Sequence, residues 1–425
     1  MYSAYIKELK IIREHPNAND LKIIEVFYND VIYNYKKVNF KLGDKIIYFP
    51  SDGILDEQFC KDNKLLREDG GYIHDNRRIK AIKLRGHKSD GLILPIEVLS
   101  KYVDVDTLKD GDQINVLNGT KICEKYIPGK KKGKPHVQKG KKKKHRVKYP
   151  FFNQHVDTNQ LRYNLSQFKE GDEVIITEKI HATSGRSGHA IKSTNRHNWL
   201  SRLFRIHLKP KKEWEYIMGS RRVNIPIKDV DKKDGFHGGN QFRLNAHKFF
   251  EDKLEKGEEV FYEIVGYDDN GNPIMPIVSN KKLKDEEFIK RYGDVTHFKY
   301  GLGVGNDVWV YRMIMTNEDG YSIEYSTDQV KWRCEQMGVN FVPILKRFYF
   351  TDVDDLMARV EDLVNGPSTI DPTHLREGIV IRLNNRPVFT AYKDKNYEFK
   401  VLEGIIKEES SEPDMEEAEE EFNEL

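Results

Sequence analysis

The sequence predicts an α+β protein, with a small β-barrel at the N-terminus followed by a larger α+β domain built on antiparallel sheets. Residues 21–28 and 44–49 are short runs rich in β-branched and aromatic side chains, and glycine–aspartate turns punctuate this part of the chain. Residues 308–315 again have the composition of a strand, whereas residues 356–363 carry apolar side chains at helical spacing. A chain of 425 residues is long enough for two or three domains.

Charge is unevenly distributed, although the formal net charge is only +3. Residues 130–148 hold eleven lysine and arginine residues and no acid, whereas residues 407–425 hold ten acids and one base. Such a basic run either is simply solvated or contacts a phosphate backbone, and we favour the phosphate contact. We predict four segments in chain order: a β-barrel domain (1–120), a basic linker (121–149), an α+β domain (150–405) and a disordered acidic tail (406–425).

The cysteine pattern indicates a reducing compartment, and the hydropathy pattern indicates neither a membrane span nor a signal peptide. Cys60, Cys123 and Cys334 are odd in number, far apart and without the spacing of a zinc site, so we expect buried or free thiols. No stretch approaches the roughly 20 apolar residues of a membrane span, and residues 1–5 lack the apolar core of a signal peptide. We therefore expect a protein of the cytoplasm, or of a host cytoplasm if it is viral, with no membrane partner.

Lysines and carboxylates occur in an order that suits phosphoryl transfer. Lys179 ends the alternating apolar stretch 173–177, so a sheet can hold its amine in place. A lysine must be neutral to attack phosphorus, and nearby cations such as Lys393 and Lys395 favour the neutral amine. These two lysines alternate around Asp394, so both project from the same face of a strand. Taken alone, Lys179 fits an ordinary strand edge equally well, and only the ordered set favours a catalytic role.

The strings around these residues resemble the covalent nucleotidyltransferases, the superfamily of polynucleotide ligases and mRNA capping enzymes. In chain order, the matching strings are Glu178-Lys179-Ile180-His181-Ala182, Ser220-Arg221, Phe261-Tyr262-Glu263-Ile264-Val265-Gly266, Glu377-Gly378-Ile379-Val380-Ile381-Arg382 and Lys393-Asp394-Lys395. The first string is similar to the KxHG form found in RNA ligases, but Ala182 stands where glycine is usual. An added methyl group can crowd the nucleotide or demand a particular backbone angle.

The N-terminal domain carries a second resemblance. Residues 15–21 and 84–92 resemble strings of the tRNA-binding type of OB-fold, a fold that binds single strands through a charged groove with aromatic platforms. These strings either bind nucleic acid or only preserve turns of the barrel. Over residues 5–405 the chain is similar to nick-sealing RNA ligases of the Deinococcus type. DNA ligases and capping enzymes usually carry a C-terminal OB domain, for which the 30 residues beyond Lys395 leave no room.

The resemblance implies a role for each matched residue. Glu178 would contact the amino edge of adenine, which favours ATP, and Arg221, with Arg222 as the fallback, would contact the ribose or the RNA end. Glu263 would hold a ribose hydroxyl or a hydrated metal. Glu377 would bind magnesium (or manganese), and Lys393 and Lys395 would contact the α-phosphate. His181 would orient the site, and either Trp309 or Tyr311 would stack on the base.

The sequence therefore predicts an ATP-dependent RNA ligase that joins a 3′-hydroxyl to a 5′-phosphate, with RNA nicked in a duplex or an RNA–DNA hybrid as its substrate. Lys179 would take AMP from ATP, AMP would pass to the 5′-phosphate, and the 3′-hydroxyl would then displace it. Two alternatives remain open. One is a non-catalytic protein that binds RNA ends on a ligase fold, which Ala182 favours, and the other is a nick ligase that prefers DNA. We expect a monomer.

Overall fold

The chain divides into two compact units. The computed structural model describes residues 2–71, 73–126, 147–194, 209–225, 241–384 and 386–409. The first unit contains the described residues up to 126 together with the C-terminal helix α7 (Tyr397–Glu409), and the second contains the described residues between 147 and 396. Helix α7 thus belongs with the N-terminal unit, which differs from the predicted α+β domain of residues 150–405.

Polar contacts over a long sequence separation fix α7 to the N-terminal unit. The ammonium group of Lys400 lies 2.6 Å from Asp90, and the hydroxyl of Tyr397 donates to the carbonyl of Ile82. Burial raises the pKa of Tyr397 well above its usual value, which keeps this donor protonated. The partners are more than 300 residues apart in the sequence, so no local pattern reveals the assignment of this helix.

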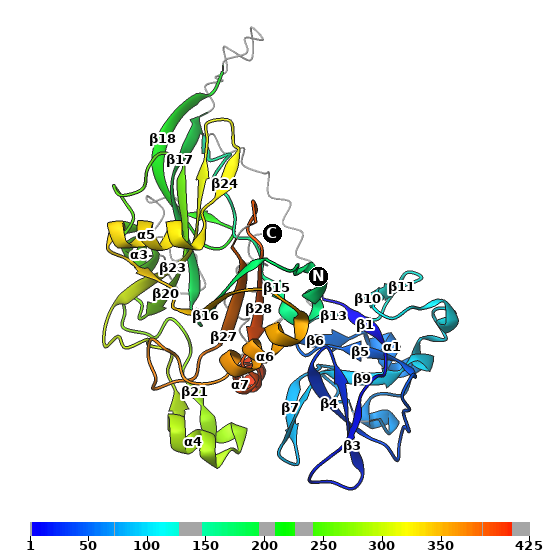
Figure 1. The fold of residues 1–425 in the computed structure, drawn as a ribbon. Helices are drawn as coiled ribbons and strands as arrows, with labels where there is room; N and C mark the ends of the chain where they lie inside the picture. The colour runs from blue at the N-terminus through cyan, green and yellow to red at the C-terminus, as the bar shows by residue number, and fades with distance from the viewer. Residues whose placement is uncertain are drawn as a thin grey trace. The chain divides into compact units, whose positions relative to one another are not determined.

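Antiparallel strands form most of the N-terminal unit (Figure 1). The elements are β1 (Ala4–Glu8), β2 (Ile12–Glu14), β3 (Leu21–Val26), β4 (Asn29–Asn34), β5 (Lys45–Phe49), β6 (Gly53–Leu55), α1 (Glu57–Asp62), β7 (Ala81–Leu84), β8 (His87–Asp90), β9 (Leu92–Pro95), β10 (Gln113–Ile114), β11 (Val116–Leu117), β12 (Thr120–Lys121) and β13 (Cys123–Lys125). One sheet has the order β10-β1-β5-β9 and another the order β2-β3-β4. Within the described ranges these pairings do not close into a single barrel, so the OB-like barrel stays a prediction.

The two N-terminal strings that resemble an OB-fold contact each other. The ring nitrogen Nε2 of His15 lies 3.1 Å from the carbonyl oxygen of Leu84, and Asn17 donates to the carbonyl of Arg85 at 3.1 Å. The rings of His15 and His87 meet edge to face, with centroids 5.7 Å apart. These contacts favour the interpretation in which the strings hold the β7–β8 turn, and they do not test whether the turn binds RNA.

Two large sheets form the second unit. Its strands are β14 (Val147–Lys148), β15 (Asn159–Gln160), β16 (Glu173–Lys179), β17 (Thr183–Thr194), β18 (Lys211–Gly219), β19 (Asn224–Ile225), β20 (Glu258–Gly266), β21 (Val278–Ser279), β22 (Val295–Thr296), β23 (Asn306–Thr316), β24 (Ser322–Glu324), β25 (Asn340–Phe341), β26 (Ile344–Tyr349), β27 (Gly378–Leu383) and β28 (Ala391–Lys395). Its helices are α3 (Gln241–Lys248), α4 (Glu286–Tyr292), α5 (Thr327–Met337) and α6 (Val353–Val364). The predicted strand at 308–315 and the predicted helix at 356–363 are confirmed as β23 and α6.

The sheets are mainly antiparallel, as predicted. The larger sheet has eight strands, six of them in the order β19-β18-β17-β20-β23-β24, with β14 on β17 and β25 on β23. The smaller sheet has the order β15-β28-β27-β16-β26 (Figure 1). Two of the pairings, β15–β28 and β23–β25, are parallel.

The five-stranded sheet separates a hydrophobic core from a polar face. Alternate residues of its central strands, among them Val174, Ile176, Ile379 and Ile381, belong to one buried cluster that includes the apolar side of α6. Successive side chains of a strand point to opposite faces. The residues between them, Thr177 and Lys179 on β16 and Val380 and Arg382 on β27, therefore lie on the other face.

Strands occupy both ends of the segment predicted as a linker. Cys123 is buried and β13 pairs with β6, while β14 pairs with β17, so residues 121–149 are not linker throughout. The remainder of the basic run, and the tail beyond 409, lie outside the described residues.

All three cysteines are buried and free, and burial raises the pKa of Cys123 to about 12. No helix within the described part of the chain is long and apolar enough to span a membrane.

A buried ion pair holds β28 from the core side of the sheet. The guanidinium of Arg162 lies 2.9 Å from Asp394, whose side chain is 2% exposed, and it also reaches Glu361 on α6. Asp394 separates Lys393 from Lys395, so this pair fixes the stretch of β28 that carries both lysines.

We predict that Arg162→Met destabilises the second unit by about 3–5 kcal/mol, because it leaves Asp394 buried without its counter-ion. Chemical denaturation gives the free energy of unfolding. Arg359→Met is the matched control, since Arg359 pairs with Asp355 one turn away on α6, both side chains are about one third exposed, and its loss should cost far less even though the guanidinium also lies over the Phe348 ring. Equal losses in the two variants would show that the Arg162 pair does not hold the sheet.

Candidate active site

Glu377 is the centre of an ion cluster at the ends of three neighbouring strands. Its carboxylate lies 2.7 Å from the ammonium of Lys179 and 3.3 Å from that of Lys395. The ring of His181 is 3.8 Å away. In the strand register, Gly378 lies opposite both Lys179 and Lys395, which brings the three charged groups together.

The cluster keeps Glu377 ionised although it is buried. Burial alone would raise the pKa of this carboxyl, but the charges of Lys179 and Lys395, together with His181, lower it to about 2. Tight packing preserves the arrangement, since a Cβ on Gly378 would lie 2.2 Å from the carbonyl oxygen of Asp394 and 2.7 Å from the Cα of Lys395. Any side chain at residue 378 would therefore push β28 and its lysines away from Glu377.

A pocket opens beside this cluster, between the two sheets of the second unit. Side chains from both sheets line it, and it opens to solvent at its mouth. The lining residues are His155, Thr158, Thr177, Glu178, Lys179, Ile180, Ser184, Arg221, Glu263, Tyr311, Thr327, Phe341, Val342, Val380, Arg382, Phe389 and Lys393.

The pocket collects most, but not all, of the predicted site residues. Glu178, Lys179, Arg221, Glu263, Tyr311 and Lys393 line it. Glu377, Lys395 and His181 do not line it and instead form the ion cluster around the Lys179 amine. Trp309 is not among the lining residues either, so of the two candidate aromatics the geometry favours Tyr311.

Glu178 lines the pocket and, within the described part of the chain, has one carboxylate oxygen bonded and one unbonded. Its Oε2 accepts hydrogen bonds from the backbone N–H of Thr369 at 2.8 Å and from the Thr369 hydroxyl at 2.5 Å. Its Oε1 has no hydrogen-bond partner among the described residues, although the side chain is buried. A buried carboxylate oxygen is costly without a donor, so this atom is suited to accept a hydrogen bond from a bound ligand.

Arg221 is fixed at the pocket wall by Asp157. Its Nη2 lies 2.6 Å from Asp157, and its side chain is 10% exposed. Arg222 reaches the same aspartate at 3.2 Å but is 31% exposed and does not line the pocket. The geometry thus favours Arg221 over Arg222. His155 continues the wall, since its backbone N–H donates to the carbonyl of Arg221 and its Nδ1 lies 2.9 Å from the hydroxyl of Tyr311.

Glu263 faces the pocket rather than solvent. It lies opposite Ser184 in the register of β17 and β20, and the Ser184 hydroxyl donates to its Oε1 at 3.1 Å. A carboxylate in this position can accept a hydroxyl or bind a hydrated cation. No group of three or more His, Cys, Asp or Glu side chains arranged to hold a metal occurs in the described part of the chain. Magnesium needs only one or two protein carboxylates, so Glu377 and Glu263 still fit a site that the ligand completes.

His181 is held by side chains that the sequence did not indicate. Its backbone N–H donates to the hydroxyl of Tyr300 at 2.6 Å, and its ring packs edge to face on Phe298 with centroids 4.6 Å apart. The Tyr300 ring in turn contacts His374. These residues come from loops more than 100 positions away, and no motif marks them. Their packing fixes the position of His181, and its orienting role stays a prediction.

Ala182 fits its position without strain. Its side chain is buried, and it is not among the described residues with positive φ. The extra methyl group therefore does not require the left-handed backbone that would demand glycine.

Comparison with known proteins identifies the family. The family model described as RNA ligase matches residues 172–402, more than half of the chain and almost all of the second unit's two sheets. The chain belongs to the RNA ligase family. It is therefore an enzyme of the ligase class, as the motif order predicted. No curated protein sequence matches it.

Solved structures of RNA ligases share the fold of the whole chain. A lysine-to-alanine variant of the Naegleria gruberi RNA ligase, with ATP and Mn, aligns with a TM-score of 0.56 at 14% identity, over 94% of this chain and 98% of that one. The same enzyme with PPi aligns with a TM-score of 0.53 at 15% identity, over 96% and 98%. At these identities the similarity establishes the fold, which includes both units.

We predict that the ion cluster gives stability a specific dependence on pH. Glu377 has a depressed pKa, so its stabilising contribution is complete above its ordinary value of 4.5 and is lost as the pH falls toward about 2. This shift corresponds to something on the order of 3 kcal/mol. The stability difference between the native enzyme and Glu377→Gln should be largest above pH 5 and should shrink in acid. A difference that does not change with pH would contradict the proposed ion cluster.

Proposed function

We propose that this ligase uses ATP and forms a covalent lysyl–AMP on Lys179. The position of Lys179 is the observation that supports this most strongly. Its side chain lines a pocket together with Arg221, Lys393 and Glu263, and Glu377 holds its amine from behind. A nucleophile, cations for phosphates and carboxylates for a metal or a ribose are thus present around one cavity. Lysine variants of the Naegleria gruberi RNA ligase, which shares the fold, were solved with ATP and Mn and with AMP and Mn.

The proposed reaction has three steps, each of which exchanges one bond at phosphorus. The neutral Lys179 amine attacks the α-phosphorus of ATP, so a P–N bond forms, the bond to pyrophosphate breaks and the amine loses a proton. An oxygen of the RNA 5′-phosphate then attacks the same phosphorus and releases Lys179. Finally, the 3′-hydroxyl attacks the activated 5′-phosphate, loses its proton and displaces AMP.

Charged residues of the pocket have distinct parts in these steps. Lys393 and Lys395 lie on the same face of β28, and their charges would offset those that develop on the α-phosphate. Magnesium or manganese bound at Glu377 and Glu263 would add positive charge beside the phosphates. Glu377 pairs with the ammonium form of Lys179, so any cation that competes for Glu377 favours the neutral amine needed for attack.

The free oxygen of Glu178 supports ATP as the nucleotide. Adenine carries an exocyclic amine that can donate to Oε1, whereas guanine has a carbonyl oxygen at that edge, which would face a carboxylate. A site that pairs a buried polar group with one substrate rejects the analogue that leaves it unpaired.

We further propose that the substrate is a nick in an RNA duplex or an RNA–DNA hybrid, joined by a cytoplasmic, monomeric enzyme. The order of the motifs and the resemblance of the N-terminal strings support the nicked substrate. Comparing nicks that have ribose or deoxyribose at the ends of the 3′-hydroxyl strand would separate it from a ligase that prefers DNA. A non-catalytic role has little support, because Ala182 fits without strain and the charged side chains assemble around one pocket.

We predict that Lys179→Ala abolishes covalent labelling by ATP carrying label at the α-phosphate. Native enzyme, incubated with magnesium and separated by denaturing electrophoresis, should retain the label. Lys192→Ala is the matched control, because Lys192 pairs with Glu215 on β18 and does not line the pocket, and it should label normally. Absence of label on folded native enzyme, with manganese and GTP also tried, would overturn the proposal.

We predict that Glu178→Gln reduces the preference for ATP over GTP by roughly tenfold or more, since an amide loses the charge-assisted hydrogen bond and can donate to guanine. The rate of labelling at varied ATP and GTP concentrations measures this preference. Thr369→Val removes one of the two hydrogen bonds that position Glu178 and should give a smaller change in the same direction. An unchanged preference in Glu178→Gln would exclude this residue from base recognition.

A further inference from the structure

The pocket extends beyond Glu178 and Lys179 to a second polar region around Arg382. Arg382 follows Val380 by two residues on β27, so both lie on the same face of the sheet. Arg382, Thr327 and Phe389 line the pocket together with Val380. The phosphate-directed residues already described do not include any of these.

Arg382 is a buried cation with unused hydrogen-bond donors. Its exposed fraction is 7%, and only its Nη2 donates, to the carbonyl of Tyr325. Its Nε and Nη1 find no acceptor among the described residues. The hydroxyl of Thr327 is likewise buried and without a partner there, while the Thr327 backbone N–H is fixed by Asn384.

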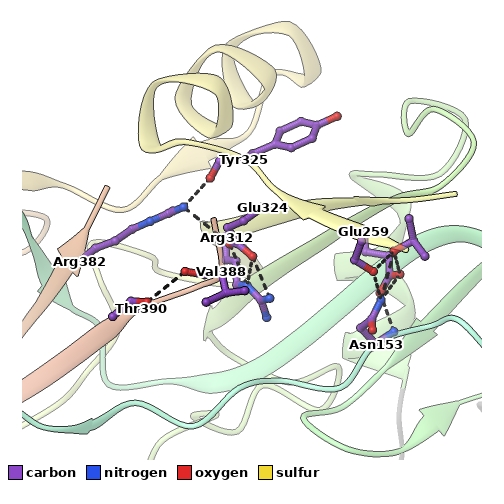
Figure 2. Close-up of polar contacts among 10 residues, drawn as sticks. Asn153, Glu259, Arg312, Glu324, Tyr325, Arg382, Val388 and Thr390 are labelled. Atoms are coloured by element: carbon purple, nitrogen blue, oxygen red, sulfur yellow. Dashed lines mark hydrogen bonds and ion pairs between the residues drawn. The ribbon is translucent and has the colours of Figure 1, made fainter. Parts of the chain in front are cut away.

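Charge in this region is unbalanced. Figure 2 shows Arg312 and Arg382 converging on one carboxylate, Glu324. Arg312 makes three hydrogen bonds to Glu324: its Nε lies 3.0 Å and 3.1 Å from the two carboxylate oxygens, and its Nη2 lies 2.9 Å from one of them. The guanidinium of Arg382 lies 3.6 Å from the same carboxylate. Burial and the neighbouring Arg312 lower the pKa of Arg382, as expected for a guanidinium short of counter-charge. The ring of Phe389 lies against both guanidinium groups and limits their movement.

The surrounding walls suit a flat heterocycle better than a phosphate. Phe341, Val342, Val380 and Phe389 make this part of the pocket largely apolar, and a phosphate would lose its hydration there. Ring nitrogens accept hydrogen bonds and tolerate apolar surroundings on both faces of the ring. Cations for phosphates are already supplied at the Lys179 end of the pocket by Lys393 and Arg221.

We propose that Arg382 and Thr327 donate hydrogen bonds to ring nitrogens of the nucleotide base, and thus read a different edge of the purine from Glu178. The inference rests on the proposed use of ATP. It assigns the nucleotide an orientation in which Lys179 meets the α-phosphate, Val380 supports the ring and Arg382 lies at the far edge. Arg382 and Thr327 are then specificity-determining residues that no step of the chemistry requires.

Deaza analogues of ATP test this directly. Each of 1-deaza-ATP, 3-deaza-ATP and 7-deaza-ATP replaces one ring nitrogen by CH and removes a single acceptor. The concentration dependence of adenylylation, read from the mass of the intact protein, gives an apparent KM for each nucleotide. At least one analogue should bind native enzyme about tenfold to a hundredfold less tightly than ATP, the range expected for a hydrogen bond from a charged donor.

The variants assign that loss to the proposed residues. Arg382→Met should weaken the binding of ATP and abolish the discrimination against the sensitive analogue. Thr327→Val should reduce that discrimination. Arg312→Met is the matched control, because Arg312 shares Glu324 but does not line the pocket. It should keep the native ratio between ATP and the analogue even if it lowers stability.

Two results would overturn the inference and leave the proposed function intact: native enzyme that accepts all three analogues as well as ATP, or Arg382→Met that weakens all four nucleotides by the same factor. Weaker binding of all four nucleotides with unchanged ratios would assign Arg382 a structural role. Native enzyme that is not adenylylated by ATP at all would instead refute the proposed function.

Discussion

The active site depends on the pairing of one buried carboxylate, Glu377, with two lysines from neighbouring strands. Burying Glu377 alone would be strongly unfavourable, and its ionisation is maintained mainly because Lys179 and Lys395 approach within 3.3 Å. The same pairing places the nucleophile and one of the phosphate-binding lysines at fixed separation before any ligand arrives. On the reverse side of the sheet, Arg162 neutralises Asp394, so β28 is held by charge from both faces. This preorganisation reduces the rearrangement that the first chemical step requires.

The alternation of side chains along β16, β27 and β28 connects stability with chemistry. Val174 and Ile176 on β16 and Ile379 and Ile381 on β27 enter the apolar cluster under α6, whereas Thr177, Lys179, Val380 and Arg382 between or beside them line the pocket. A shift of one residue in register would exchange the two sets, moving lysines into the core and isoleucines into the site. The close approach of Gly378 to β28 helps to fix that register. The catalytic arrangement is thus a consequence of sheet packing, and substitutions in the core under α6 are expected to act on the site through β27 and β28.

Sequence alone could predict the parts of the site that depend on local pattern. Strand alternation placed Lys393 and Lys395 on one face, and the register confirms it. What it could not supply depends on distant contacts: Thr369 orienting Glu178, Tyr300 holding His181, and helix α7 packing on the N-terminal unit. The choice between Trp309 and Tyr311 was also beyond the sequence, because a register shift between Phe261 and Tyr262 makes Tyr311 an extra residue in β23. Such a bulge re-aims a side chain in a way that composition does not reveal.

The central claim is that the Lys179 amine, held by Glu377, is the atom that carries AMP. Locating the adenylate tests it most directly: native enzyme is incubated with ATP and magnesium, digested under conditions that preserve a phosphoramide, and its peptides are sequenced by tandem mass spectrometry. The account predicts AMP on Lys179 and on no other lysine. AMP on Lys393 or Lys395, or an adenylate that is never covalently attached although RNA ends are joined, would contradict it.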